Sequence, residues 1–180
     1  ALQYLQKELA DNPKNGYAYF RMAWIFLQKD ENGQALTNIE KALKLLPKKD
    51  GEYVAYSHNV KAMVYNNLGQ KDKCIEELGL AIAAQPEDID YLNFRGQRYY
   101  EMKKYDLSNA DYLRITKIDQ GSTVGFLGLG RNATEQKNYA EAEKNFDHAL
   151  KLSPDETQVY CFRAECYIGQ KKWGKAIDDI

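Results

Sequence analysis

The sequence predicts an all-α protein built from stacked helical hairpins, and a fixed repeat interval is the main evidence. Small residues stand 34 positions apart at Gly96, Gly130 and Ala164, and aromatic residues keep the same interval at Tyr139 and Trp173. A period shared by unrelated residue types marks an internal repeat, and this length is typical of a helix-turn-helix unit. We therefore expect a stack of hairpins rather than a globular enzyme with a single pocket.

Five repeat windows follow when the small residue of each first helix is numbered position 8. They cover residues 16–49, 55–88, 89–122, 123–156 and a truncated 157–180, and residues 1–15 form a partial repeat that supplies only a second helix. Small residues recur at positions 8 and 20, which are Ala23, Ala62, Gly96, Gly130 and Ala164, and then Ala35, Cys74, Ser108, Ala142 and Ala176. Two helices can cross at short distance only where the contact residues barely protrude.

Larger side chains repeat on the same faces. Positions 4, 8 and 11 follow the i, i+4, i+7 spacing of one helix face, and positions 20, 24 and 27 do so in the second helix. Proline ends the second helix at Pro47, Pro86 and Pro154. The first two prolines are separated by five residues more than the period, so we expect 49–54 to form a longer loop or an N-terminal extension of the next helix.

At these positions the chain resembles the tetratricopeptide repeat family. The resemblance covers residues 16–180 and is clearest in the fourth window, which carries Leu129, Gly130, Ala142, Phe146, Ala149 and Pro154. It implies a right-handed α-α superhelix, a solenoid of stacked antiparallel helix-turn-helix repeats. Residues 1–180 would form one array, which we expect to be part of a longer protein.

The chain departs from the family pattern at position 7, where a leucine is usual. Lys61, Arg95 and Arg163 stand there instead. We expect their long stems to cover apolar neighbours while the charges reach water.

Composition argues against several classes of function. The 25 basic and 26 acidic residues are nearly balanced, so no field draws nucleic acid or anionic lipid to the chain. No apolar run approaches the roughly 18–20 residues that span a bilayer. Three cysteines mildly favour a reducing compartment, and we expect a cytoplasmic protein.

No catalytic or metal-binding constellation is evident. His58 occupies core position 4, where a packed aromatic substitute is favoured over a ligand or base, and His148 is expected to be solvated. No His, Cys or carboxylate set has the spacing of a metal site, so we expect no catalysis, cofactor or metal. The glycines of 121–130 suggest a phosphate loop, but the repeat register explains Gly130 as a contact residue and Ser122 or Thr123 as a helix cap.

Two surface signals have simple explanations. The Asn132-Ala-Thr134 glycosylation acceptor lies in the middle of a predicted helix, where we expect it to be silent. Lysines cluster at the turn inside each hairpin, at Lys29, Lys71, Lys103, Lys104, Lys137, Lys171 and Lys172. Cations there stabilise a helix C-terminus; an edge that meets an acidic partner is the alternative.

The face of each first helix opposite the core is the predicted binding surface. In tetratricopeptide repeat proteins this face lines a concave groove that holds peptides. Carried over by position, the candidates are Tyr17, Phe20, Trp24, Tyr56, Asn59, Met63, Asn93, Gln97, Tyr100, Leu127 and Arg131. Aromatic residues opposite the core are explained either by a bound partner or by packing against preceding repeats.

The predicted function is a non-catalytic scaffold that binds a partner peptide or protein in this groove, with no role for nucleic acid or membrane insertion. The alternative is a regulatory or targeting array of a larger enzyme or assembly, and self-association through open repeat ends is a further option. The basic clamp that some family members use for chaperone tails is not matched. Because Arg131 is the one clear cation of this face, we expect a ligand with an apolar anchor and an acid, and weak binding of polybasic peptides.

Overall fold

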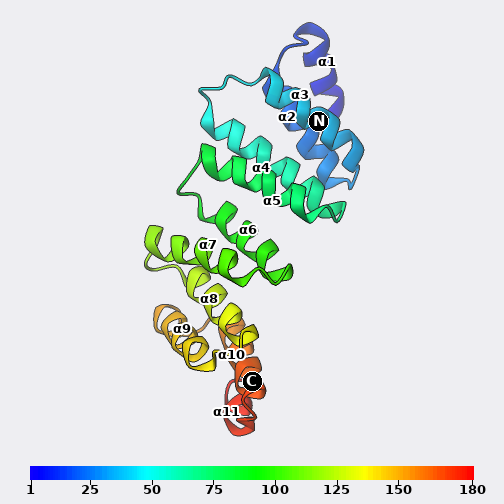
Figure 1. Cartoon of the computed structure of the whole chain (residues 1–180). Coiled ribbons are helices and arrows are strands. Elements are labelled where there is room, and N and C mark those ends of the chain that lie inside the picture. Colours follow the sequence, from blue (N-terminus) through cyan, green and yellow to red (C-terminus); the bar gives the residue numbers. More distant parts are fainter. The chain divides into compact units, whose positions relative to one another are not determined.

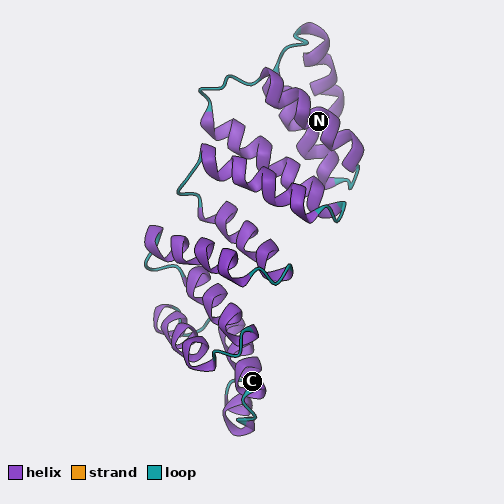
Figure 2. Cartoon of the chain, in the orientation of Figure 1, coloured by secondary structure: helices purple, strands orange, loops and turns teal.

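The computed structural model describes residues 1–180, and every regular element in it is a helix (Figure 2). The helices are α1 (Leu2–Asp11), α2 (Gly16–Gln28), α3 (Asn32–Leu45), α4 (Gly51–Asn67), α5 (Lys71–Ala84), α6 (Ile89–Glu101), α7 (Tyr105–Ile118), α8 (Thr123–Glu135), α9 (Tyr139–Leu152), α10 (Thr157–Gly169) and α11 (Trp173–Asp178). Figure 1 shows them along the chain. The predicted all-α class is confirmed.

The chain divides into two compact units, and the boundary falls inside α6. The first unit, Ala1–Tyr91, holds α1 and the hairpins α2–α3 and α4–α5 (Figure 1). The second unit, Leu92–Ile180, holds the rest of α6 with α7, followed by the hairpins α8–α9 and α10–α11.

The predicted register of small residues is confirmed by close helix contacts. All ten residues at positions 8 and 20 are buried. A Cβ atom added to Gly130 would lie 2.5 Å from Cε1 of Phe146, so no side chain fits there without displacement. In the α6–α7 pair, the Ser108 hydroxyl donates a 2.8 Å hydrogen bond to the carbonyl of Gly96. The two helices of each hairpin therefore approach at the residues that the period identified.

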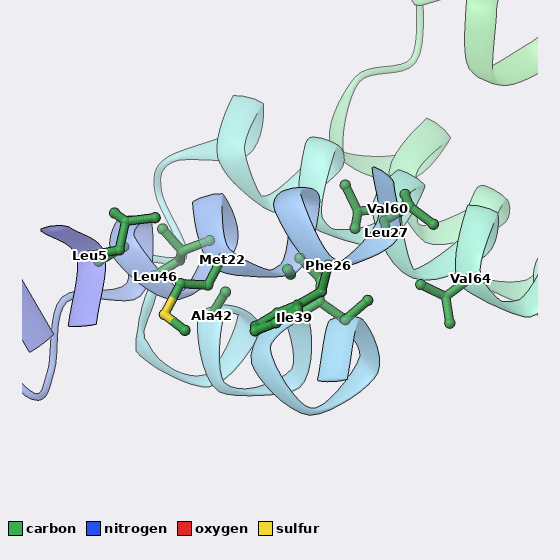
Figure 3. Close-up of a cluster of buried hydrophobic side chains, with 12 residues drawn as sticks. Leu5, Met22, Phe26, Leu27, Ile39, Ala42, Leu46, Val60 and Val64 are labelled. Atoms are coloured by element: carbon green, nitrogen blue, oxygen red, sulfur yellow. The ribbon is translucent and has the colours of Figure 1, made fainter. Parts of the chain in front are cut away.

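The core of the first unit lies between α2 and α3 and extends to α4. Ile39 and Val64 are completely buried there, and Phe26 packs in the same cluster (Figure 3). Leu5 of α1 joins this cluster, so α1 docks on the first hairpin through an apolar side chain. Burying a side chain of this size contributes roughly 1.5–3 kcal/mol.

The extra residues before the second hairpin form the first turn of α4. Asp50 caps this helix, because its Oδ1 atom accepts a hydrogen bond from the backbone N–H of Tyr53 at 3.3 Å. Its other oxygen accepts a 2.6 Å hydrogen bond from the Tyr17 hydroxyl on α2. Of the two predicted alternatives, the helix extension is correct.

The position-7 cations keep some access to water, as expected, but each also contacts an acid that the sequence pattern did not indicate. Lys61 pairs with Glu77 at 2.7 Å and Arg95 with Asp111 at 2.6 Å, and both acids lie on the second helix of the same hairpin. Arg163 pairs at 2.6 Å with Asp179, the residue that directly follows α11. The acids are nearly inaccessible, with side-chain exposures of 9%, 4% and 6%. A buried carboxylate needs a partner, which the cation supplies across the hairpin.

The sequence contains a signal for these pairs in the spacing of the charged residues. In each case the acid stands 16 residues after the cation, at position 23. In the windows where position 7 is apolar, namely Met22 and Leu129, position 23 is Asn38 or Asn145. The same two repeat positions therefore hold either a cation and an acid or an apolar residue and an asparagine.

His58 also belongs to this polar contact rather than to a purely apolar one. Its Nδ1 atom lies 2.7 Å from Oε2 of Glu77, while Lys61 contacts the other oxygen. Burial raises the pKa of Glu77, but the hydrogen bonds from His58 and Lys61 outweigh it and hold the pKa below its usual range. The network is therefore a structural ion cluster inside the second hairpin.

Several turn lysines occupy a constrained backbone position. Lys103, Lys137 and Lys171 have φ values of 57°, 59° and 62°, and Gly69 holds the corresponding place in the second hairpin with φ 70°. The left-handed conformation after a helix usually selects glycine. These three lysines therefore adopt it at a conformational cost.

The glycine-rich segment 121–130 leads into α8 and forms much of it, with Ser122 at the N-cap but without a side-chain capping hydrogen bond. Asn132 is fully buried, and its amide donates to Ser108 Oγ at 2.9 Å and Asn109 Oδ1 at 2.7 Å. That nitrogen is unavailable to a glycosylating enzyme in the folded chain. His148 is exposed as expected, although its ring lies 4.0 Å from that of Phe126.

Candidate functional site

An aromatic cluster forms on α2 and α4 of the first unit. Tyr53 is at its centre, with ring centroids 4.8 Å from Tyr17, 5.5 Å from Phe20 and 6.1 Å from Tyr56. All three contacts are edge-to-face, the geometry that the charge distribution of aromatic rings favours. Tyr53 lies in the additional turn of α4, outside the repeat window, so position-by-position reasoning missed it.

Beside this cluster is an open groove with a volume of about 500 Å³. We call it the aromatic groove. Its walls come from α2, α4 and the start of α6, and they consist of Phe20, Trp24, Tyr53, Tyr56, Asn59, Val60, Asp88, Asp90 and Tyr91. Ligand sites in proteins are concave spaces of roughly 300–1,000 Å³. The size and the aromatic lining fit a short peptide segment.

Four of the sequence candidates meet in the aromatic groove: Phe20, Trp24, Tyr56 and Asn59. Trp24 is 41% exposed and Tyr56 is 38% exposed. Trp24 also lines a second, mostly apolar opening of about 310 Å³ between α1 and α2, together with Tyr4 of α1. The indole therefore stays accessible although α1 already packs against α2.

Most polar groups around the aromatic groove have partners. The Tyr56 hydroxyl donates to Glu52 at 3.0 Å, and this hydrogen bond raises the pKa of Tyr56. Asp88 accepts hydrogen bonds from the backbone N–H groups of Asp90 and Tyr91 at 2.9 and 3.2 Å, which caps the start of α6. These bonds hold the carboxylates of Glu52 and Asp88 at the edge of the groove.

Tyr91 is a groove residue whose polar group has no such partner. Its side chain is 3% exposed, yet its buried hydroxyl has no hydrogen-bond partner. Burial, followed by the negative charge of Asp88, raises the pKa of Tyr91 well above its ordinary value. A buried hydroxyl without a partner costs about 1–3 kcal/mol, and this one is enclosed by the chain rather than open to the groove.

The candidates of the second unit do not form a comparable opening. The guanidinium of Arg131 lies 4.5 Å from the ring centroid of Tyr100 and 4.3 Å from that of Phe162. Only about 10 Å³ of space remains beside them. Tyr100 also donates to Glu135 at 3.2 Å. Arg131 is thus held in a stack between two rings, a cation–π arrangement.

The remaining candidates make contacts within the fold. Gln97 donates to Asn93 Oδ1 at 3.2 Å, so these two amides pair with each other on α6. Met63 packs against the core of the first unit and Leu127 against that of the second. Tyr17 is bonded to Asp50, which raises the pKa of Tyr17. None of these five lines the aromatic groove.

No group of three or more His, Cys, Asp or Glu residues is placed to hold a metal ion. None of the helices combines the length and the apolar character needed to cross a membrane.

Comparison with known proteins identifies the family. Sequence profiles described as tetratricopeptide repeat match residues 16–49, 55–88 and 127–180. The chain belongs to the tetratricopeptide repeat family. Among curated proteins, tetratricopeptide repeat protein 16 of Mus musculus is 24% identical over 181 residues, which is 92% of this chain and 24% of the relative. Mitochondrial import receptor subunit TOM34 of Rattus norvegicus is 31% identical over 104 residues, or 55% of this chain and 33% of that protein.

Solved tetratricopeptide repeat structures share the fold. A protein from Parabacteroides merdae has a TM-score of 0.83 at 22% identity and is matched over 99% of this chain and 69% of its own. YrrB, described as a tetratricopeptide repeat protein with an unusual peptide-binding site, has a TM-score of 0.76 at 17% identity, with 99% and 90% coverage. The matched region thus spans about a quarter to a third of the length of the curated relatives named above. It spans 69% and 90% of the length of the two solved chains.

Proposed function

We propose that this chain is a non-catalytic interaction module that binds a peptide segment of a partner protein in the aromatic groove. The observation that carries the proposal is an accessible space of about 500 Å³ whose walls include two half-exposed rings, Trp24 and Tyr56. Large exposed aromatic side chains are the residues that most often dominate binding energy at interfaces. Tetratricopeptide repeats generally mediate protein–protein interaction, which supports the same role.

The neighbouring proteins support this proposal through their names. TOM34 is named an import receptor subunit, and YrrB is described as having a peptide-binding site. For the compartment we propose the cytoplasm, which the three free cysteines favour.

The test is a selection of peptides from a random display library on the immobilised chain, followed by calorimetry with synthetic peptides. Trp24→Ala should weaken binding by about 1–2 kcal/mol, because truncating an aromatic anchor removes its buried contact area. Leu80→Ala is the matched control, since Leu80 is an exposed apolar residue of α5, 46% accessible, that does not line the groove. Equal affinities for the wild type and Trp24→Ala, with both folded, would place binding elsewhere.

A second function is supported by the lengths of the relatives. Since the curated proteins named above extend far beyond the matched region, we also propose that the repeats serve as a regulatory or targeting array of a larger protein whose activity lies outside these residues. The complete coding sequence decides between an isolated module and such an array. An adjoining catalytic domain would favour the second function.

A further inference from the structure

Two kinds of side chain meet at the aromatic groove, and together they indicate the charge of its ligand. The walls contain five aromatic residues and two carboxylates, Asp88 and Asp90, but no lysine or arginine. A third carboxylate, Glu52, accepts a hydrogen bond from the hydroxyl of Tyr56, one of the groove residues. The charged side chains that line this groove are therefore acidic, although the whole chain is nearly neutral and Arg21 lines the adjoining opening on the α1 side of Trp24.

From this arrangement we infer that the aromatic groove contains a subsite for a lysine or arginine side chain of the bound peptide. The inference rests on the proposed function and adds the chemistry of the ligand. The stem of the basic side chain packs against the rings of Trp24 and Tyr56, and its charged end meets Asp90 and Asp88. Cations bind favourably over aromatic faces, most strongly over tryptophan, and carboxylates supply the hydrogen-bond acceptors.

Each carboxylate retains capacity for this role. The Asp90 side chain is exposed and makes no hydrogen bond within the chain, so it is the principal acceptor. Asp88 uses one oxygen, Oδ1, to cap α6, and its second oxygen makes no hydrogen bond within the chain. Because the α6 N-terminus is already capped by Asp88, its partial positive charge is offset at the point where an anionic ligand would otherwise bind.

This ligand differs from the acidic peptide expected from the sequence. That expectation depended on Arg131, whose guanidinium is stacked between Tyr100 and Phe162 in the second unit. In the first unit the accessible charges at the groove are carboxylates instead.

The test uses Trp24 as a spectroscopic probe. The chain has two tryptophans, so Trp173→Phe leaves Trp24 as the sole indole. Three synthetic peptides would be titrated against this variant: capped Leu-Lys-Leu, and the same sequence with norleucine or glutamate in the central position. Norleucine keeps the aliphatic stem of lysine and removes only the ammonium group.

The lysine peptide should bind at least tenfold more tightly than the norleucine peptide, and the glutamate peptide should bind least. Asp90→Asn should reduce the preference for lysine three- to tenfold without changing the affinity for norleucine, and added salt should do the same by screening. Glu76→Gln is the matched control, because Glu76 is an exposed acid of α5 away from the groove.

The outcomes separate the two proposals. If the display-selected peptides depend on Trp24 while lysine and norleucine bind equally well, the groove remains a binding site and the cation subsite is wrong. Preference for the glutamate peptide would overturn the charge argument directly. If neither the selected peptides nor these three respond to changes at Trp24, the proposed function fails together with the subsite.

Discussion

The buried pair of Arg95 and Asp111 offers the sharpest test of how the hairpins are held together. Arg95 Nε donates to Asp111 Oδ2 at 2.9 Å, and Nη2 donates to Oδ1 at 2.6 Å, so the contact is bidentate. The arginine side chain is 21% exposed and the aspartate side chain 4%. Breaking such a pair on one side leaves a largely buried charge without its partner, which costs about 3–5 kcal/mol.

We therefore expect Asp111→Asn and Arg95→Leu each to lower the free energy of unfolding by about 3 kcal/mol, near the low end because the arginine retains some access to water. The double variant recreates the combination of Leu129 and Asn145 that occupies the same contact in the α8–α9 hairpin. It should lie within about 1 kcal/mol of the wild type, since replacing a buried ion pair by a compatible set is often nearly neutral. The two changes should thus be strongly non-additive.

Urea unfolding of the wild type, both single variants and the double variant measures this coupling. The slopes must be compared as well as the midpoints, because repeat arrays can unfold in parts. Lys144→Ala is the control: its pair with Glu141 spans 3.7 Å between exposed side chains, and its loss should change stability by less than about 0.5 kcal/mol. Additive losses in the double variant would show that the ion pair does not act as a unit and would refute the reasoning.

Three further predictions concern packing, backbone and pH. Gly130→Ala should destabilise the chain by about 1–3 kcal/mol, because the added Cβ would lie 2.5 Å from Phe146. Gly33→Ala should instead stabilise it by about 0.5 kcal/mol, because Gly33 has open space around it in a helix. Melting temperatures that shift in the same direction for both variants would contradict this. Lys137→Gly should stabilise by about 1 kcal/mol because φ is 59° there, and a lower urea midpoint would count against it. The pKa of Glu77 is lowered in the fold, so its contribution to stability is complete above its unfolded value of about 4.3 and disappears as the pH falls through the folded value. Acid titration of Glu77→Gln should therefore show a shallower loss of stability than the wild type, and an identical slope would exclude this origin.

The sequence by itself determined the helices, their pairing into hairpins and the residues at which the paired helices touch. This was possible because the faces of a helix follow from a fixed rotation of about 100° per residue, and because a repeat places equivalent residues at equivalent contacts. Gly130 and Ala142 could be assigned to the hairpin contact for this reason, and both are buried there. The ends of α3 and α5 before Pro47 and Pro86 could also be predicted from the local sequence, because proline lacks the N–H that a continuing helix needs.

Only the tertiary structure decided what each polar or aromatic side chain contacts. The helix wheel put Arg131 and Trp24 on equivalent faces, but the first is stacked between two rings while the second borders an open groove. Tyr53 and Tyr91 reach the groove from an additional helical turn and from the start of α6, which a repeat alignment does not relate to Trp24. Whether a side chain is covered depends on the position of the neighbouring helix and on the rotamers of both partners, and neither is a property of a single helix.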